Sequence, residues 1–242
     1  LYLPLFRENE IVGVMTVQSD RDHAYSDDII EMLEAVASFA AIAVENARIM
    51  IRLNEMNQII SGEKAQVEKA ALASSWLAEH DSLTGLSNRR FLERVLDENI
   101  RLAALENTSI AVFFVDLDDF KNVNDTRGHD AGDRVLVAVG ARLASVFRDG
   151  DYVARVGGDE FVVVAPGIRN IDSVAAIADK VVASFDEPIA IAEGPVAVTV
   201  SIGITQFPDH GGDSQELISR ADEAMYSIKR TGKGAWRMWS VF

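Results

Sequence analysis

The sequence predicts an α/β fold: an α+β sandwich with a central mixed sheet, preceded by a long helical linker. From residue 81 onward, short apolar runs alternate with amphipathic stretches, as strands and helices do when helices cover one sheet. Before residue 81, apolar residues recur at spacings of three and four, which is typical of a helix. With 242 residues, 48% hydrophobic and 25% charged, the chain suffices for one sizeable domain plus an appendage.

The first part of the chain predicts a strand, a loop and the start of a helix. Residues 10–18 form the strand, and the polar residues 19–25 form the loop. Ser26 is placed to cap the helix. Asp27 and Asp28 follow in its first turn, where acidic side chains are favoured by the helix dipole.

This helix carries a heptad pattern, which predicts a parallel coiled coil between two copies of the chain. Asn46, Glu63 and Ser74 also fall on the seam, and Asn46 can fix its register. Gly62 and Glu63 interrupt the pattern, so a single amphipathic helix packed on its own domain stays an alternative. The apolar seam residues are Ile42, Ile49, Leu53, Met56, Ile60, Val67, Ala70 and Leu77.

Beyond the polar, turn-rich segment Asp81–Arg90, the expected elements follow in sequence. They are a helix over 89–106, a strand over 109–116, a short helix over 117–124, a loop over 125–133 leading into a helix that ends near 147, a hairpin within 151–164, a helix over 171–185, strands over 189–192 and 196–204, a helix over 214–229 capped by Ser214, and a last strand over 236–240.

The hairpin is the most informative stretch. Apolar residues lead to Gly157 and Gly158, which predict the turn because glycine adopts positive φ without steric cost. Asp159 and Glu160 follow at the tip and should point to opposite sides of the second strand, so that one of them faces a given site. Taken alone, the segment fits an acidic, solvated turn equally well.

A second acid sharpens this interpretation. Asp116 ends an almost wholly apolar strand, where a carboxylate without a partner is unusual. If the strands of Asp116 and Asp159 are neighbours, two hard oxygen ligands meet at one sheet edge, which suits magnesium rather than zinc. Such a pair can hold two metal ions about 4 Å apart for in-line attack on phosphate. Two unrelated solvated acids are the alternative.

Four polar residues are further candidates for nucleotide binding. Asn124 and Asp133 offer the acceptors and donors that a guanine edge requires, although such residues are commonly caps or turns. Lys229 and Lys233, at the end of a predicted helix, can bind triphosphate oxygens or can simply answer the helix dipole.

Composition excludes several classes of protein. The net charge of −15 repels polyanions and argues against long nucleic acid as a partner. The absence of cysteine excludes disulfide and thiolate sites and fits a reducing compartment. No apolar run approaches the roughly 20 residues that span a bilayer. The chain begins Leu1-Tyr2-Leu3-Pro4-Leu5, which is typical of mid-domain sequence and predicts a fragment, so an upstream membrane-bound or sensory portion stays open.

Five segments in order resemble the motifs of GGDEF-family diguanylate cyclases, from Asp81 to the end of the chain. The resemblance implies a fold like the palm of nucleotidyl cyclases and a bacterial, cytoplasmic enzyme that condenses two GTP into cyclic di-GMP with release of two pyrophosphates. A homodimer would bring two such domains face to face. The segments are Asp81–Arg90, Asp116–Lys121, Asn124–Asp133, Gly157–Phe161 and Ala221–Lys229.

The resemblance also assigns roles to residues. Mg²⁺, or alternatively Mn²⁺, would be held at the acidic edge, with Asp159 as the base for the ribose 3′-hydroxyl and Glu160 beside it. Arg148 and Asp151 match the family's RxxD site, which implies inhibition by bound product. The implied metal ligands are Asp116, the carbonyl of Leu117, Asp159 and Glu160; the guanine readers are Asn124 and Asp133; the phosphate-binding cations are Lys121, Lys229 and Lys233.

The N-terminal part resembles the last third of a GAF sensor domain, through residues 3–5, the strand 11–14 and the helix 41–48. The predicted organisation is therefore a GAF-like remnant over 1–48, a coiled-coil helix over 49–80 and a GGDEF domain over 81–242. Two other classes compete with an active cyclase: a non-catalytic receptor for cyclic di-GMP or GTP, and a cyclase with a single-ring product. Retention of Asp116, Asp159 and Glu160 argues against the receptor, and the pair Asn124 and Asp133 argues against the other cyclase.

Overall fold

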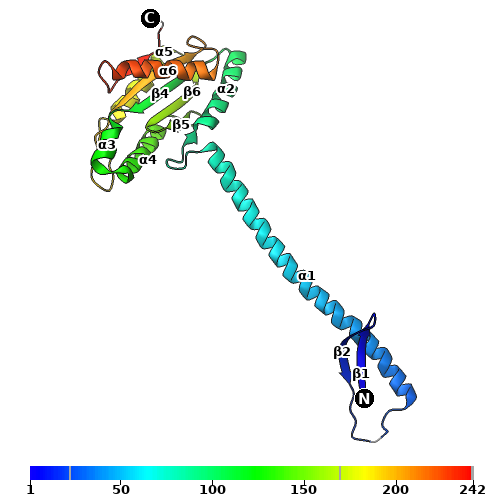
Figure 1. Cartoon of the computed structure of the whole chain (residues 1–242). Coiled ribbons are helices and arrows are strands. Elements are labelled where there is room, and N and C mark those ends of the chain that lie inside the picture. The colour runs from blue at the N-terminus through cyan, green and yellow to red at the C-terminus, as the bar shows by residue number, and fades with distance from the viewer. Residues whose placement is uncertain (22, 169, 241–242) are drawn as a thin grey trace. The chain divides into compact units, whose positions relative to one another are not determined.

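The computed structural model describes residues 1–21, 23–168 and 170–240, without the side chains of residues 71, 72 and 171. The chain divides into two compact units, Leu1–Leu72 and Ala73–Phe242. Figure 1 labels many of the elements. In chain order they are β1 (Tyr2–Arg7), β2 (Glu10–Thr16), α1 (Asp27–Glu79), β3 (Ser87–Asn88), α2 (Arg89–Glu106), β4 (Ser109–Leu117), α3 (Phe120–Arg127), α4 (His129–Val146), β5 (Tyr152–Gly157), β6 (Glu160–Ile168), α5 (Ile171–Ser184), β7 (Val200–Phe207), α6 (Ser214–Lys229) and β8 (Trp236–Met238).

In the first unit, β1 and β2 form an antiparallel pair. Leu3 and Leu5 of β1 are buried against Ala37 and Ala41 of α1. The sequence predicted β2 but not β1. In this two-stranded pair β1 is an edge strand, where a proline such as Pro4 is tolerated.

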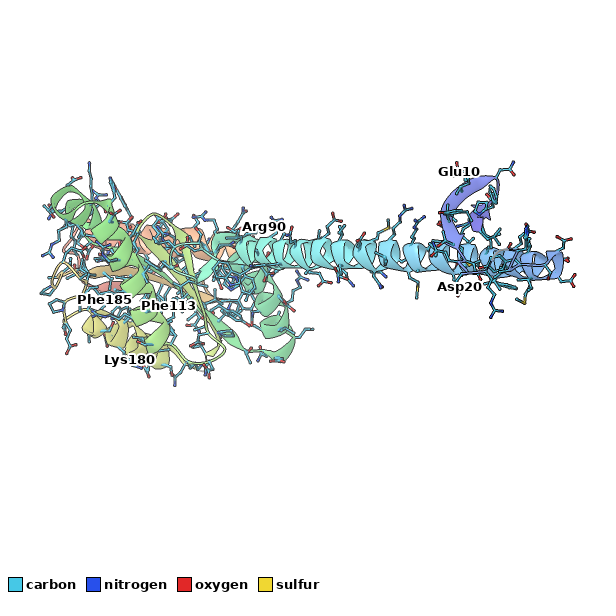
Figure 2. All side chains as sticks on the ribbon, turned by 90° about the horizontal axis from the view of Figure 1, so that it is seen from below. Glu10, Asp20, Arg90, Phe113, Lys180 and Phe185 are labelled. Atoms are coloured by element: carbon cyan, nitrogen blue, oxygen red, sulfur yellow. The ribbon has the colours of Figure 1, made fainter. Side chains whose placement is uncertain are left out.

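Helix α1 begins at Asp27, as predicted, and continues through Gly62 to Glu79. Its apolar seam side chains are exposed, from 40% at Ile49 to 68% at Val67. Figure 2 shows side chains projecting from α1 along its length. An amphipathic helix packed on its own domain would bury this seam, so the exposure favours the coiled-coil alternative.

The second unit is built on one mixed sheet with strand order β3-β5-β6-β4-β7-β8, in agreement with the predicted fold. The outer pairs β3–β5 and β7–β8 are parallel, and the inner pairs are antiparallel. Helices α2 and α6 cover one face, and α4 and α5 cover the other (Figure 1). Figure 2 places Phe113 and Phe185 within this unit, where both are buried, and Lys180 at its surface.

The helix predictions differ in their accuracy. Helix α2 has the predicted bounds, and the side chain of Asn88 caps it by accepting from the backbone N–H of Phe91. Helix α3 begins three residues later than predicted, and much of the expected loop over 125–133 belongs to α3 and α4, which meet at Gly128. The cap of α6 is Asp213 rather than Ser214, since the carboxylate of Asp213 accepts from the backbone N–H of Glu216.

Three predicted strands are wrong or have other bounds. Residues 189–192 form no strand; Ile189 and Val196 make an isolated bridge. The following strand, β7, begins at Val200 and extends to Phe207, because its partner β4 provides pairing for that segment. The last strand ends at Met238 instead of residue 240.

The hairpin forms as predicted, but its turn is shifted by one residue. Gly157 pairs with Glu160, so Gly158 and Asp159 make the turn, and Gly158 has a φ of +49°. An irregularity in the register between Arg155 and Gly157 accompanies this shift. Asp159 therefore lies in the turn itself rather than on the second strand.

Candidate active site

Strands β4 and β6 bring the predicted acids together. Asp116 lies directly opposite Glu160 in the antiparallel pair, so both side chains project from the same face of the sheet. The backbone N–H of Leu117 donates to the carbonyl of Asp159 at 3.3 Å, which draws the turn to the end of β4. The sequence predicted that only one of Asp159 and Glu160 faces a given site. In the structure, both carboxylates are close enough to Asp116 to raise its pKa.

Asp116 is the electrostatic centre of this edge. It is 5% exposed, and its Oδ1 forms an ion pair with Lys229 Nζ. The pKa of Asp116 is raised to about 6: burial is the largest cause, the carboxylates of Asp159 and Glu160 add to the rise, and Lys229 opposes it. A buried carboxylate among other acids therefore lacks sufficient cationic partners.

This shortage of positive charge around Asp116 suits a divalent cation. The carboxylate of Asp116, next to those of Asp159 and Glu160, provides the hard oxygen ligands that Mg²⁺ prefers. Within residues 1–21, 23–168 and 170–240, no group of three or more His, Cys, Asp or Glu side chains is already arranged around a metal position. Asp116 and Glu160 are in register across two strands, next to the turn that carries Asp159.

Asp222 and Arg89, two neighbours of Glu160, were not predicted as site residues. Burial raises the pKa of Glu160; Asp222 and Asp159 add to the rise, whereas Arg89 and Lys229 oppose it. Burial likewise raises the pKa of Asp222 on α6. The spacing held a signal, because Asp222 precedes Lys229 by seven residues and so shares its face of the helix.

A third missed residue, Asp118, organises the loop that follows β4. It is 5% exposed. Its carboxylate accepts from the hydroxyls of Thr199 and Ser201, both at 2.7 Å, and from the backbone N–H of Gly234 at 3.0 Å. Asp118 therefore connects the segment that follows Asp116 to β7 and to the loop after α6.

The three predicted phosphate-binding lysines lie on different elements. Lys121 is exposed on α3. Lys229 ends α6, as predicted, and Lys233 lies beyond the helix with a φ of +55°. Lys233 Nζ donates to Asp119 at 2.7 Å, and this bond raises the pKa of Lys233. Lys229 thus reaches Asp116 near the end of β4, and Lys233 reaches Asp119 in the segment that follows this strand.

The predicted guanine readers lie on α3 and α4, two helices that pack together. The Oδ1 of Asn124 lies against Gly132, where an added Cβ would be only 1.9 Å away. Asp133 is the next residue and is exposed. A surface pocket of about 470 Å³ includes Asp133 in its lining, together with Leu83 and Ile191.

Arg148 and Asp151 also lie together, away from the acidic edge. Arg148 donates to Asp151 through its backbone N–H at 3.1 Å and through Nε at 3.3 Å, and Nη2 donates to the carbonyl of Pro166 at 2.6 Å. The Arg148 side chain is 64% exposed, whereas that of Asp151 is buried. Both residues line a pocket of about 390 Å³.

The profile of the family described as "Diguanylate cyclase, GGDEF domain" matches residues 78–235. The chain belongs to the GGDEF family. A GAF domain profile matches residues 1–45, in agreement with the predicted N-terminal remnant. None of the helices in the described residues is long and apolar enough to cross a membrane.

Known GGDEF proteins resemble the second unit in sequence and structure. Diguanylate cyclase TpbB of Pseudomonas aeruginosa is 41% identical over 176 residues, which are 72% of this chain and 40% of TpbB. The crystal structure of the TpbB GGDEF domain has a TM-score of 0.64 at 39% identity and covers 66% of this chain and 99% of that one. A structure of the coiled coil and GGDEF domain of DgcB from Caulobacter crescentus, in complex with c-di-GMP, has a TM-score of 0.66 at 27% identity, covering 77% and 98%.

Proposed function

We propose that this GGDEF domain is a diguanylate cyclase that condenses two GTP into cyclic di-GMP and two pyrophosphates. The observation that carries the proposal is the buried Asp116, in register with Glu160 and beside Asp159, with Lys229 as a partner. A receptor that only binds nucleotide has no need to bury one carboxylate among others at a cost in free energy. The match to TpbB, itself named a diguanylate cyclase, supports the same activity.

At the acidic edge, Asp116, the carbonyl of Leu117, Asp159 and Glu160 would hold the divalent metal that cyclases of this family use. We propose Mg²⁺, with Mn²⁺ as a substitute. The metal would neutralise charge that develops on the reacting phosphate. Asp159, half-buried in the turn, would accept the proton of the attacking ribose 3′-hydroxyl.

The remaining polar residues bind the rest of GTP. Asn124 and Asp133 read the guanine edge. Lys121, Lys229 and Lys233 bind phosphate oxygens and oppose the charge that develops in the transition state. Lys229 and Lys233 are paired with Asp116 and Asp119 in the protein described here, so nucleotide and metal would take over these pairings.

The reaction joins two GTP molecules, and we propose that each is held by one subunit of a homodimer. The exposed apolar seam of α1 supplies the interface. A coiled coil of this kind keeps two catalytic domains at high local concentration, so that their encounter becomes intramolecular.

Arg148 and Asp151 form a site for the product, which inhibits further synthesis. The exposed guanidinium retains donors for phosphate or guanine beyond its bonds to Asp151 and Pro166. We expect Arg148→Ala to relieve inhibition by added cyclic di-GMP, with Arg142→Ala as the arginine control. Unchanged inhibition in Arg148→Ala would remove this part of the proposal.

The activity is tested by incubating the purified chain with GTP or ATP and Mg²⁺, then identifying products by mass. We expect cyclic di-GMP from GTP alone, and none from Asp159→Ala, while Asp172→Ala, an exposed acid in the first turn of α5, remains active. A folded, dimeric wild-type chain that binds GTP without making product would refute the cyclase in favour of a receptor.

A further inference from the structure

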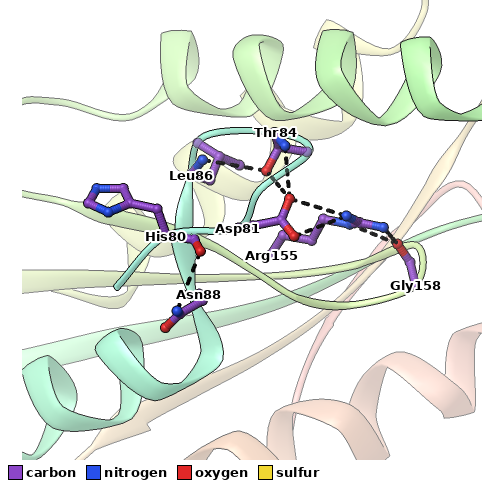
Figure 3. A network of polar contacts seen from close by, with 7 residues as sticks. All are labelled: His80, Asp81, Thr84, Leu86, Asn88, Arg155 and Gly158. Carbon is purple, nitrogen blue, oxygen red and sulfur yellow. Dashed lines mark hydrogen bonds and ion pairs between the residues drawn. The ribbon is translucent and has the colours of Figure 1, made fainter. Parts of the chain in front are cut away.

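Arg155, two residues before the signature glycines, makes a network of polar contacts around the catalytic turn (Figure 3). Its Nε and Nη2 donate to the carbonyl oxygen of Gly158 at 2.9 and 2.8 Å. Its Nη1 donates to both carboxylate oxygens of Asp81 at 3.1 Å. The two side chains are 15% and 20% exposed, so solvent screens this ion pair less than it screens a surface pair.

Asp81 is itself held in place by a compact turn. Its Oδ1 accepts from the backbone N–H of Thr84 at 2.8 Å and from the Thr84 hydroxyl at 2.7 Å. Its backbone N–H donates to the carbonyl of Leu86 at 2.8 Å. Burial alone would raise the pKa of Asp81, but the bonds from Thr84 and Arg155 together hold that pKa below its usual value. Asp81 is therefore a fixed, charged anchor for the guanidinium.

The carbonyl that Arg155 binds belongs to the peptide unit leading into Asp159. Gly157 and Gly158 are exposed, and an added Cβ would meet nothing within 4 Å of either. Glycine has wide conformational freedom, so packing does not hold this turn. The two bonds from Arg155 fix the orientation of the Gly158 carbonyl, and thereby the direction in which Asp159 leaves the turn.

We propose that Arg155 is a positioning residue for the reaction: anchored by Asp81, it holds the turn that presents Asp159 to the metal and to the 3′-hydroxyl. This inference rests on the proposed cyclase activity. It makes the geometry of the catalytic turn depend on a segment that begins two residues after α1 ends.

A positioning role and a merely structural one predict different results. Loss of a structural ion pair lowers stability and leaves the turnover of folded molecules unchanged. Loss of positioning lowers kcat, since a displacement of about 1 Å at a reacting group can cost roughly 10²-fold in rate, while GTP contacts elsewhere preserve KM. Arg142 provides a matched control, because it too donates to backbone carbonyls, those of Ser184 and Glu187, away from the acidic edge.

The experiment compares wild type, Arg155→Ala, Arg155→Lys, Asp81→Asn and Arg142→Ala, all as the full chain. Steady-state kinetics give kcat and KM for GTP, and hydrogen exchange follows the peptide that contains the signature turn. We expect kcat to fall about 10- to 100-fold in Arg155→Ala with KM within about threefold, partial recovery in Arg155→Lys, and faster exchange at the turn. Arg142→Ala should match wild type in kcat and in exchange at the turn.

The outcomes separate this inference from the proposed function. A wild-type chain without product refutes the cyclase, and exchange at the turn then still tests the role of Arg155. Folded Arg155→Ala with wild-type kcat, or with unchanged exchange at the turn, overturns the inference. If Arg155→Ala does not fold, Asp81→Asn decides, because asparagine can still accept from Thr84 while the ion pair is lost; unchanged kcat in that variant also overturns the inference.

Discussion

Substitution of Gly132 by alanine tests how the guanine readers are placed. Gly132 lies on α4 and faces Asn124 of α3. A Cβ on Gly132 would be 1.9 Å from Oδ1 and 3.0 Å from Cγ of Asn124, and 3.3 Å from Cζ of Phe120. The nearest atoms belong to a side chain that can rotate. The fold should therefore survive while the Asn124 amide turns away from its present position.

The expected effects on stability and on binding have opposite signs. Replacing glycine by alanine in a helix adds about 0.5–1 kcal/mol of stability, so thermal unfolding should not occur at a lower temperature. Misplacing an amide that pairs with a buried base edge costs about 1–3 kcal/mol. At about 1.4 kcal/mol per tenfold, KM for GTP should rise roughly 5- to 150-fold.

The assay measures KM and unfolding temperature for Gly132→Ala, Asn124→Ala and the double variant. If both single substitutions act through the same amide, the double variant should be no worse than Asn124→Ala. Gly62→Ala on α1, where a Cβ meets nothing within 4 Å, is the control for the change in residue type. Folded Gly132→Ala with KM within twofold of wild type would refute this reasoning, as would additive effects in the double variant.

Three further predictions concern the fold and the assembly. Gly203→Ala should cost about 3 kcal/mol or more in urea unfolding, because its Cβ would be 1.8 Å from a backbone oxygen of α6; a loss below 1 kcal/mol would contradict the packing. His210 accepts from the backbone N–H of Gln206 at 3.0 Å, and burial lowers the pKa of His210. The unfolded chain therefore takes up the proton first, so the free energy of unfolding should fall as the pH drops below about 6.5. His210→Asn should lack this pH-dependent loss when unfolding is measured at pH 7.5 and 5.5. Leu53→Lys on the seam should give monomers by light scattering and lower activity per chain, whereas Ile51→Lys, similarly exposed but off the seam, should stay dimeric. If both variants remain dimeric, the seam is not the dimer interface.

Most elements could be predicted because their signals are local. The apolar run that ends in Asp116 and the turn glycines of the hairpin are read within a few residues, and α2 was placed with its observed bounds. Predictions failed where pairing with a distant segment decides the structure. Residues 189–192 look like a strand but have only an isolated bridge, and β7 extends to Phe207 because β4 pairs with it that far.

The sequence by itself determined the family, the acids and the cations, because these are identities and spacings along the chain. Only the tertiary structure decided which of them meet. Sheet register sets Asp116 opposite Glu160, and the Arg155–Asp81 pair joins residues 74 positions apart. Asp118 reaches Gly234 across 116 positions. No local periodicity encodes such contacts, since they depend on how strands pair and on where loops cross the edge of the sheet.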